Sequence, residues 1–183
     1  MTTPKGIIVQ KGKYNATQQY ANWIGQDLDL PVFSAGGLAG SKLTGREFVV
    51  ICSAVYMGKL LIKGWLKKNL HTLQRRKIFL VVVCGTPSSE KEKLAAVIRS
   101  SVPGPLINQI ETCFLPGRLV IKDLTLMDSL LLKIGSKLEK DPAKRQAMLR
   151  DIDGVKRENI EPVVKAVRTF VFQENARFTL ESV

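Results

Sequence analysis

The sequence predicts an α/β protein whose parallel sheet is covered by helices on both faces. Short runs that are apolar at every position and rich in β-branched residues alternate with longer segments whose apolar residues recur at helical spacing. Continuous apolarity is typical of strands buried on both faces, and regular alternation of strand and helix is typical of parallel sheets. The chain has 183 residues, the length of one ordinary domain, so we expect a single domain over residues 1–183.

The first half of the chain contains three strand candidates. Residues 6–10 (GIIVQ) form a short apolar run, and a glycine-containing loop separates them from a helical pattern over residues 16–28. Residues 30–34 (LPVFS) include a proline, which suits an edge strand, and a connection rich in Gly and Ser follows at 35–46. Residues 48–53 (FVVICS) are apolar on both faces, as in a buried parallel strand.

The alternation continues in the middle of the chain. Residues 58–70 predict a helix with an apolar stripe on one side and a line of lysines on the other. Residues 77–84 (KIFLVVVC) form the strongest strand candidate, which we expect at the centre of the sheet. A serine-capped helix is expected over 88–101, and residues 112–115 are the fifth strand candidate.

Three further segments complete the chain. Residues 123–140 predict a helix whose apolar stripe we interpret as core packing. Residues 141–154 are charged and predict a short helix or a loop. Residues 160–172 predict the closing helix, and the tail from about residue 175 is expected to fray.

Composition excludes several classes of protein. No apolar run approaches the ~20 residues needed to cross a bilayer, and no signal-peptide pattern opens the sequence, so we expect a cytoplasmic protein, with peripheral membrane contact as an alternative. Cys52, Cys84 and Cys113 lie in or at the end of apolar runs without C-x-x-C spacing, which predicts buried thiols rather than a redox or zinc site. His71 is the single histidine, which disfavours a histidine-based hydrolase.

Positive charge is concentrated in one part of the sequence. The net charge is +12, and no acidic residue occurs between Glu47 and Glu90, whereas seven lysines and arginines do. Such a surface favours an acidic protein, anionic lipid or nucleic acid as partner. A basic face that only contacts solvent would give the same sequence pattern. Nucleic acid is the least expected partner, because the segment lacks interleaved exposed aromatic residues and a known binding motif.

Loops after the strands carry the candidate chemistry, because parallel sheets bind ligands at the carboxyl ends of their strands. The loop over residues 11–17 precedes a helix N-terminus, and Thr17 adds a hydroxyl, so a phosphate monoester could bind there. The loop contains neither a Walker motif nor G-x-G-x-x-G, and any strand-to-helix turn needs small flexible residues.

Two further loops could hold a flat ring system. Residues 53–59 and 84–87 follow the third and fourth strand candidates and combine backbone donors with apolar side chains. Tyr56 is the candidate for stacking on such a ring; the alternative is an ordinary, partly buried tyrosine.

Several motifs resemble those of the flavodoxin-domain proteins. The run G-K-Y-N-A-T at 12–17 is similar to their phosphate loop S-K-Y-G-x-T, and S-A-V-Y-M-G-K at 53–59 is similar to S-x-I-Y-x-G-K. The resemblance continues through K-K-N-L at 67–70, L-P-G-R-L at 115–119 and I-E-P-V-V at 160–164. The arrangement is most similar to the branch that contains the menaquinone-dependent protoporphyrinogen oxidases.

This resemblance implies a flavodoxin-like three-layer sandwich with a five-stranded parallel sheet of order 2-1-3-4-5, and one flavin mononucleotide (FMN). The implied phosphate site comprises Gly12, Lys13, Tyr14, Asn15, Ala16 and Thr17. The implied isoalloxazine site comprises Ala54, Val55, Tyr56, Met57, Gly58, Gly85, Thr86 and Pro87, with Pro116, Gly117 and Arg118 nearby. None of these residues is expected to act as an acid, base or nucleophile.

Two positions depart from the family pattern. Gly12 replaces a serine or threonine and removes one hydroxyl contact to the phosphate, and Asn15 replaces a glycine. Asparagine tolerates a positive φ better than other residues with a side chain, so the turn is expected to survive, with reduced FMN affinity as a consequence to test.

Three functions follow from the resemblance. The first is a quinone-linked FMN oxidoreductase of the protoporphyrinogen-oxidase type, which would approach a membrane through its basic face or the 123–140 helix. The second is an electron carrier between redox partner proteins, although carriers of that kind are usually acidic. The third is a basic interaction module that has lost FMN. Arg118 and Lys59 are the charges expected to tune a bound flavin.

Overall fold

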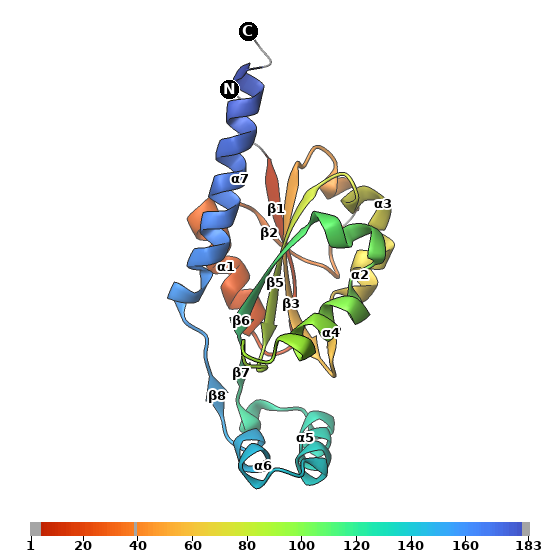
Figure 1. The fold of residues 1–183 in the computed structure, drawn as a ribbon, viewed down its shortest axis with the longest axis vertical. Helices are drawn as coiled ribbons and strands as arrows, with labels where there is room; N and C mark the ends of the chain where they lie inside the picture. Colours follow the sequence, from red (N-terminus) through yellow and green to blue (C-terminus); the bar gives the residue numbers. More distant parts are fainter. Residues whose placement is uncertain (1–4, 39, 181–183) are drawn as a thin grey trace.

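The sheet is built from five parallel strands. The computed structural model describes residues 5–38 and 40–180. The five strands are β1 (Gly6–Lys11), β2 (Val32–Ser34), β3 (Phe48–Tyr56), β5 (Lys77–Cys84) and β6 (Ile110–Pro116). They run in the order β2-β1-β3-β5-β6, all neighbours being parallel, while β4 (Lys59–Leu60) pairs antiparallel with the end of β3 (Figure 1). Without that hairpin strand the order is the expected 2-1-3-4-5.

Helices cover both faces of the sheet, as its apolar strands require. On one face lie α1 (Ala16–Leu28) and α7 (Glu161–Leu180), and on the other lie α2 (Lys63–Lys68), α3 (Leu70–Leu73) and α4 (Lys91–Ser101) (Figure 1). Short 3-10 helices occur at Gly40–Leu43, Gly104–Gln109, Ile121–Asp123 and Arg157–Ile160.

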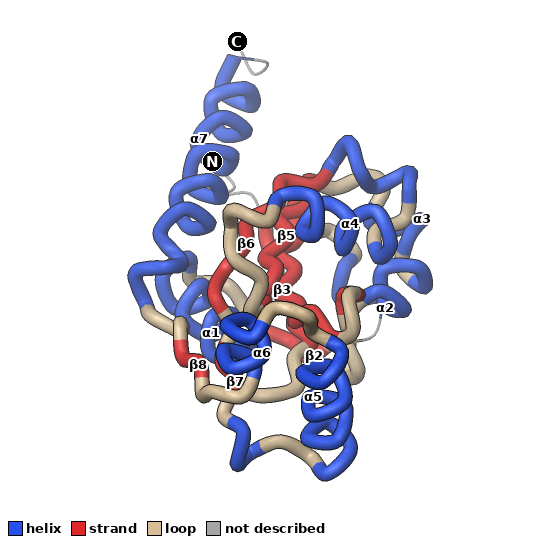
Figure 2. The backbone as a smooth tube through the Cα atoms, turned by 60° about the horizontal axis from the view of Figure 1, so that its bottom comes forward, coloured by secondary structure: helices blue, strands red, loops and turns tan. Residues whose placement is uncertain are grey.

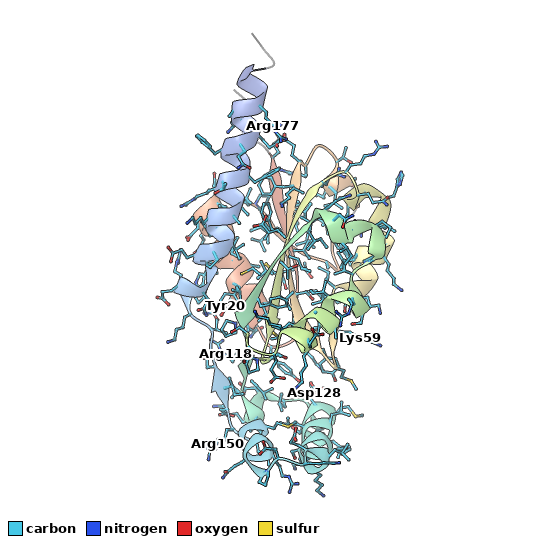
Figure 3. All side chains as sticks on the ribbon, viewed as in Figure 1. Tyr20, Lys59, Arg118, Asp128, Arg150 and Arg177 are labelled. Carbon is cyan, nitrogen blue, oxygen red and sulfur yellow. The ribbon has the colours of Figure 1, made fainter. Side chains whose placement is uncertain are left out.

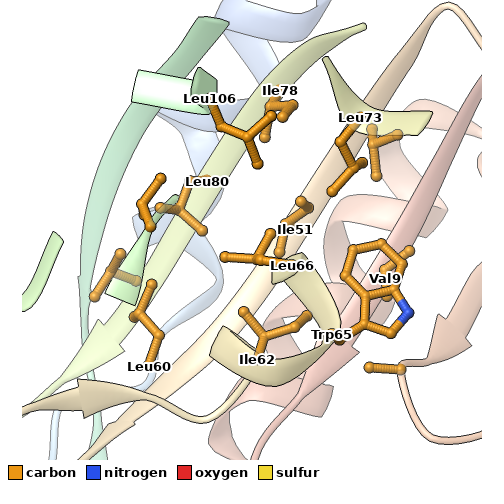
Figure 4. Packing of buried hydrophobic residues seen from close by; sticks show 14 of the residues in the cluster. Val9, Ile51, Leu60, Ile62, Trp65, Leu66, Leu73, Ile78, Leu80 and Leu106 are labelled. Atoms are coloured by element: carbon orange, nitrogen blue, oxygen red, sulfur yellow. The ribbon is translucent and has the colours of Figure 1, made fainter. Parts of the chain in front are cut away.

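Alternate residues of the central strands enter two separate hydrophobic cores. Ile51 and Leu80 are register partners on β3 and β5, and both pack with Trp65 and Leu66 beneath α2 (Figure 4). On the opposite face, Phe48 and Phe79 pack edge to face with each other and with Phe170 of α7. The sheet is therefore the shared wall of both cores.

A helical extension lies beyond the carboxyl ends of the strands. Directly after β6, the strand β7 (Arg118–Leu119) pairs antiparallel with β8 (Ile152–Asp153). Between them run α5 (Leu126–Leu138) and α6 (Pro142–Met148), which Figure 2 shows in front of the strand ends. We call residues 120–151 the cap, and β7 with β8 the stem.

The structure corrects several expected boundaries. β3 continues to Tyr56 rather than ending at residue 53, because its last residues pair with β4. The helix expected at 58–70 is instead this hairpin followed by α2 and α3. The helix expected from residue 88 begins at Lys91, and α7 continues through Leu180 although fraying was expected from about residue 175.

The interpretation of the apolar stripe at 123–140 as core packing was wrong. Leu126, Met127, Leu130, Ile134 and Leu138 are 47–93% exposed on the outer face of α5. Leu124, Leu131 and Leu132 face inward, toward the ends of the strands. The cap is thus apolar on two sides. Among the described residues, no helix is long and apolar enough to cross a membrane.

Cysteine burial also differs from expectation at one position. Cys52 and Cys84 are buried, whereas Cys113 is partly exposed on the edge strand β6. Burial raises the pKa of Cys52 to about 12.

The start of β1 requires a residue without a side chain. A Cβ on Gly6 would lie 2.1 Å from the ring of Phe48, and that ring is held by Phe79 and Phe170. We expect Gly6→Ala to lower the free energy of unfolding by about 1–3 kcal/mol through overpacking. Urea unfolding measures the change. Gly64→Ala, in α2 with no atom within 4 Å of the new methyl group, is the control and should be neutral or slightly stabilising. Equal stability of the two variants would contradict this account.

Candidate functional site

A cavity of about 480 Å³ lies between the carboxyl ends of the strands and the cap. Its size falls within the range of ~300–1,000 Å³ usual for small-molecule sites, and its walls are mainly apolar. The sheet side is formed by the ends of β3 and β5 and by Gly117, directly after β6. The opposite side is formed by the inward leucines of the cap, with Met148 and Ile152.

The loop after β1 forms one end of the cavity. Asn15 adopts φ 59°, the left-handed conformation that its asparagine was expected to tolerate, and α1 begins at the next residue. The Asn15 side chain makes no capping hydrogen bond, so the first-turn amides of α1 lack a side-chain acceptor from their own cap. Lys13, Tyr14 and Thr17 line the cavity beside this helix N-terminus. A helix N-terminus with an adjacent lysine suits an anion.

Gly12 is needed by the packing of this loop. A Cβ at Gly12 would lie 2.7 Å from the Cβ and 2.9 Å from the Oγ1 of Thr17, which is 2% exposed. The glycine at position 12 therefore allows Thr17 to pack closely against the loop. Compared with the family pattern, the loop lacks the hydroxyl at position 12 and keeps the hydroxyl of Thr17.

The β3–β4 hairpin forms a second wall. Tyr56 is the last residue of β3, and the turn passes through Met57 and Gly58, both with positive φ. The Lys13 ammonium lies 4.3 Å from the centroid of the Tyr56 ring, a cation–π contact. One face of this aromatic ring is thus engaged by a cation at the edge of the cavity.

The ends of β5 and β6 complete the sheet side. The Gly117 amide donates to the carbonyl of Cys84 at 2.8 Å, which keeps these two strand ends together. Burial raises the pKa of the Cys84 thiol, so this cavity residue is protonated at neutral pH. The Pro116 carbonyl instead accepts a hydrogen bond from Tyr20, beneath α1, at 3.0 Å.

Arg118 belongs to both the cavity and the stem. Its Nε donates to Asp153 at 2.8 Å across the β7–β8 ladder, and its Nη1 donates to Gln19 of α1 at 3.2 Å. Hydrogen bonding to the Val155 amide and then to Arg118 lowers the pKa of Asp153. Lys59 is exposed on β4 and does not line the cavity.

Asp128, in the first turn of α5, joins the cap to two of the loops. Its carboxylate accepts hydrogen bonds from Tyr14 and from Tyr56, the latter at 2.6 Å, and forms an ion pair with Lys13 at 2.6 Å. The side chain is 7% exposed. Figure 3 shows Asp128 between the ends of the strands and the helices of the cap. The hydrogen bond to Asp128 is the largest influence that raises the pKa of Lys13.

Most of the expected site residues meet at this cavity. Those that line it are Lys13, Tyr14, Ala16, Thr17, Ala54, Val55, Tyr56, Met57, Gly85, Gly117 and Arg118. Those that do not are Gly12, Asn15, Gly58, Thr86, Pro87 and Pro116. Gly12 and Asn15 shape the phosphate-type loop, and Gly58 shapes the hairpin turn.

Sequence reasoning missed the contribution of the cap. Asp128, Leu124, Leu131, Leu132 and Met148 line the cavity but lie far along the chain from the strand-end loops. An acidic residue in the first turn of a helix is ordinarily explained by the helix dipole. The sequence around Asp128 therefore gave no indication of partners elsewhere in the chain.

The packing of Gly12 yields a test. We expect Gly12→Ser, which restores the residue type of the family pattern, to lower the free energy of unfolding by about 1–3 kcal/mol, because the added atoms meet Thr17. Thermal or urea unfolding measures it. Gly37→Ser, at a loop position with no atom within 4 Å, is the matched control. A serine variant at position 12 as stable as the control would show that the loop has room for the hydroxyl.

Comparison with known proteins places the chain in a family. The model of the flavodoxin domain matches residues 7–146, most of the chain. Solved structures with a similar fold include a flavodoxin from the domain Archaea, with 15% identity, 72% of this chain and 94% of that chain covered, and a TM-score of 0.46. Oxidised flavodoxin 2 from Bacillus cereus has 16% identity, coverage of 66% and 88%, and a TM-score of 0.46. No curated protein sequence matches the chain. On the family match, the chain belongs to the flavodoxin-domain family.

Proposed function

We propose that this chain is an FMN-dependent oxidoreductase with a small hydrophobic substrate of its own, of the quinone-linked protoporphyrinogen-oxidase type. FMN is the cofactor of the flavodoxin-domain family. The observation that carries the proposal is the cap, whose inward leucines form one wall of an apolar cavity at the strand ends.

The residues at the cavity fit FMN. Lys13, Thr17 and the N-terminus of α1 suit the phosphate, and Tyr56 offers an aromatic face. The backbone around Ala54 and Gly85 borders the cavity and suits the polar edge of the ring. FMN when bound supplies the electron-transfer chemistry, so the protein needs no acid, base or nucleophile of its own.

The chain's own groups determine position, charge and access to water. Lys13 and Arg118 bring donors to the cavity, and each is held by a carboxylate, Lys13 by Asp128 and Arg118 by Asp153. Leu124, Leu131 and Leu132 exclude water from the side that faces the strand ends. Porphyrinogen carboxylates would suit the cationic surface of the chain, whose net charge is +12.

The cap is the reason to favour an enzyme over an electron carrier. A carrier passes electrons to partner proteins through an accessible cofactor edge, whereas here the described residues 120–151 lie over the strand ends (Figure 2). A covered apolar cavity suits a small hydrophobic substrate better than docking of a protein. The net charge of +12 also differs from the acidic character usual in carriers.

The outer face of α5 supports contact with a membrane that contains quinone. Its five exposed apolar residues follow one stripe, and Lys133, Lys137 and Lys140 lie along the same segment. Exposed apolar stripes with flanking lysines are typical of helices that lie in the headgroup region of anionic bilayers. This orientation would bring the cap and the cavity close to a lipid-dissolved substrate.

FMN binding is the first test. We expect the purified protein to show flavin absorption bands, directly or after FMN is added, and Tyr56→Ala with Thr17→Ala to weaken binding about 10-fold or more, or about 1.4 kcal/mol. Fluorescence titration measures the affinity. Phe172→Ala, an exposed residue of α7 outside the cavity, should bind FMN as the wild type does. If the protein binds no flavin in either condition, the interaction-module hypothesis is the better account.

Activity assays of the flavin-loaded protein then distinguish the enzyme hypothesis from the electron-carrier hypothesis. Oxidation of a porphyrinogen with menaquinone as acceptor supports the enzyme. Rapid electron exchange with redox partner proteins, and no turnover of either small molecule, would support the carrier.

Membrane contact has its own test. We expect the wild type to co-float with vesicles of anionic phospholipid, and Leu130→Glu with Ile134→Glu to reduce the bound fraction severalfold, because both changes place charge on the outer stripe of α5. Phe172→Glu adds charge at an exposed apolar residue of α7 and should bind normally. Loss of binding on charge reversal of Lys67 and Lys68 alone would point to the basic α2 surface instead.

A further inference from the structure

We propose that Asp128 is a latch: its carboxylate holds the cap closed over the cavity and keeps Lys13 and Tyr56 in position, and thereby controls the exchange of the cofactor. The part of this proposal that concerns FMN rests on the proposed function, whereas the closing of the cap does not.

The contacts of Asp128 converge from two separate parts of the chain. Lys13 and Tyr14 belong to the loop after β1, and Tyr56 ends β3, so α5 is joined to both by one side chain. Tyr56 donates to Oδ1, whereas Tyr14 and Lys13 donate to Oδ2. Charge-assisted hydrogen bonds of this kind are stronger than neutral ones, and this carboxylate is 7% exposed.

Two other cap carboxylates accept hydrogen bonds from backbone amides of the cap. Asp151 accepts from the amide of Ile121, and Glu139 accepts from the amide of Asp141. The chain enters and leaves the cap through the stem, and α5 packs against α6 while its outer face is exposed. The stem therefore acts as the attachment at one side, and Asp128 fastens the first turn of α5 at the other.

The same residues would serve the cofactor and the latch. Lys13 lies at the proposed phosphate end, and Tyr56 offers the proposed stacking ring. Their orientation is set by Asp128, so a ligand would meet them already arranged when the cap is closed. On this proposal, a ligand the size of FMN enters and leaves when α5 moves away from these loops, and that movement breaks all three contacts of Asp128.

Asp128→Asn is the informative change because it keeps the size of the side chain. An asparagine has one acceptor oxygen and no charge, so it cannot accept from both tyrosines and pair with Lys13 as the carboxylate does. Asp151→Asn is the matched control, since it removes the same charge from the cap while the asparagine oxygen can still accept from the Ile121 amide within the cap.

Hydrogen exchange of the FMN-free protein tests the latch without the cofactor. We expect Asp128→Asn to accelerate amide exchange in α5 and α6 about 10-fold or more, with β5 and α7 unchanged and Asp151→Asn like the wild type. Unchanged exchange in α5 would overturn the latch, whatever FMN does. If Asp128→Asn is too unstable to fold, Tyr14→Phe with Tyr56→Phe removes two of the donors and is expected to act in the same direction; unchanged exchange in that variant would also overturn it.

Stopped-flow fluorescence of flavin binding tests the control of exchange. A latch predicts that Asp128→Asn raises the association and the dissociation rate constants together, each about 10-fold, because both pass through the open cap. An increase in dissociation alone would describe an ordinary lost contact and would overturn the latch. If the wild type binds no FMN, the proposed function fails, while the exchange experiment still decides the closing of the cap.

Discussion

The burial of both faces of the parallel sheet is the constraint on which the rest of the structure depends. β3 and β5 are apolar at nearly every position, so helices must cover each side, and right-handed crossovers bring the carboxyl ends of the strands to one edge. That edge has no helix layer of its own, and the loops that meet there are free to vary. The cavity, the loop of Lys13 and Thr17, and the hairpin at Tyr56 all lie there for this reason.

The cap changes what this edge can do. In an open site the ends of the strands would face solvent, whereas the leucines of α5 here close the cavity from above. The stem can form because Gly154 allows close approach to Pro116: a Cβ at Gly154 would lie 2.5 Å from the Cβ of that proline. Arg118 and Asp153 join the two short strands of the stem. The cap is apolar on two sides: its inward side faces the cavity. Its outward side, on α5, is exposed and available to a partner.

Local chemistry in the first loop shows how a departure from a family pattern can be compensated. Asn15 adopts the positive φ for which the pattern has a glycine, and Gly12 gives up a hydroxyl so that Thr17 can pack closely. The turn into α1 keeps a residue with positive φ, while the side chains at positions 12 and 15 change. The Lys13 ammonium lies over Tyr56 and beside Asp128, so the charge of this loop is already organised by its neighbours.

The sequence by itself determined the five parallel strands, their order in the sheet and the three loops that border the cavity, because continuous apolarity, turn residues and family motifs are local signals. It also determined that Asn15 could adopt a left-handed conformation. Only the tertiary structure decided that Tyr56 ends a paired strand, and that the 126–138 helix caps the cavity with five of its seven large apolar residues exposed. It also decided that Asp128 reaches Tyr14 across 114 positions. Helical periodicity specifies which residues share a face of a helix, but what that face meets depends on where the stem directs the chain in space.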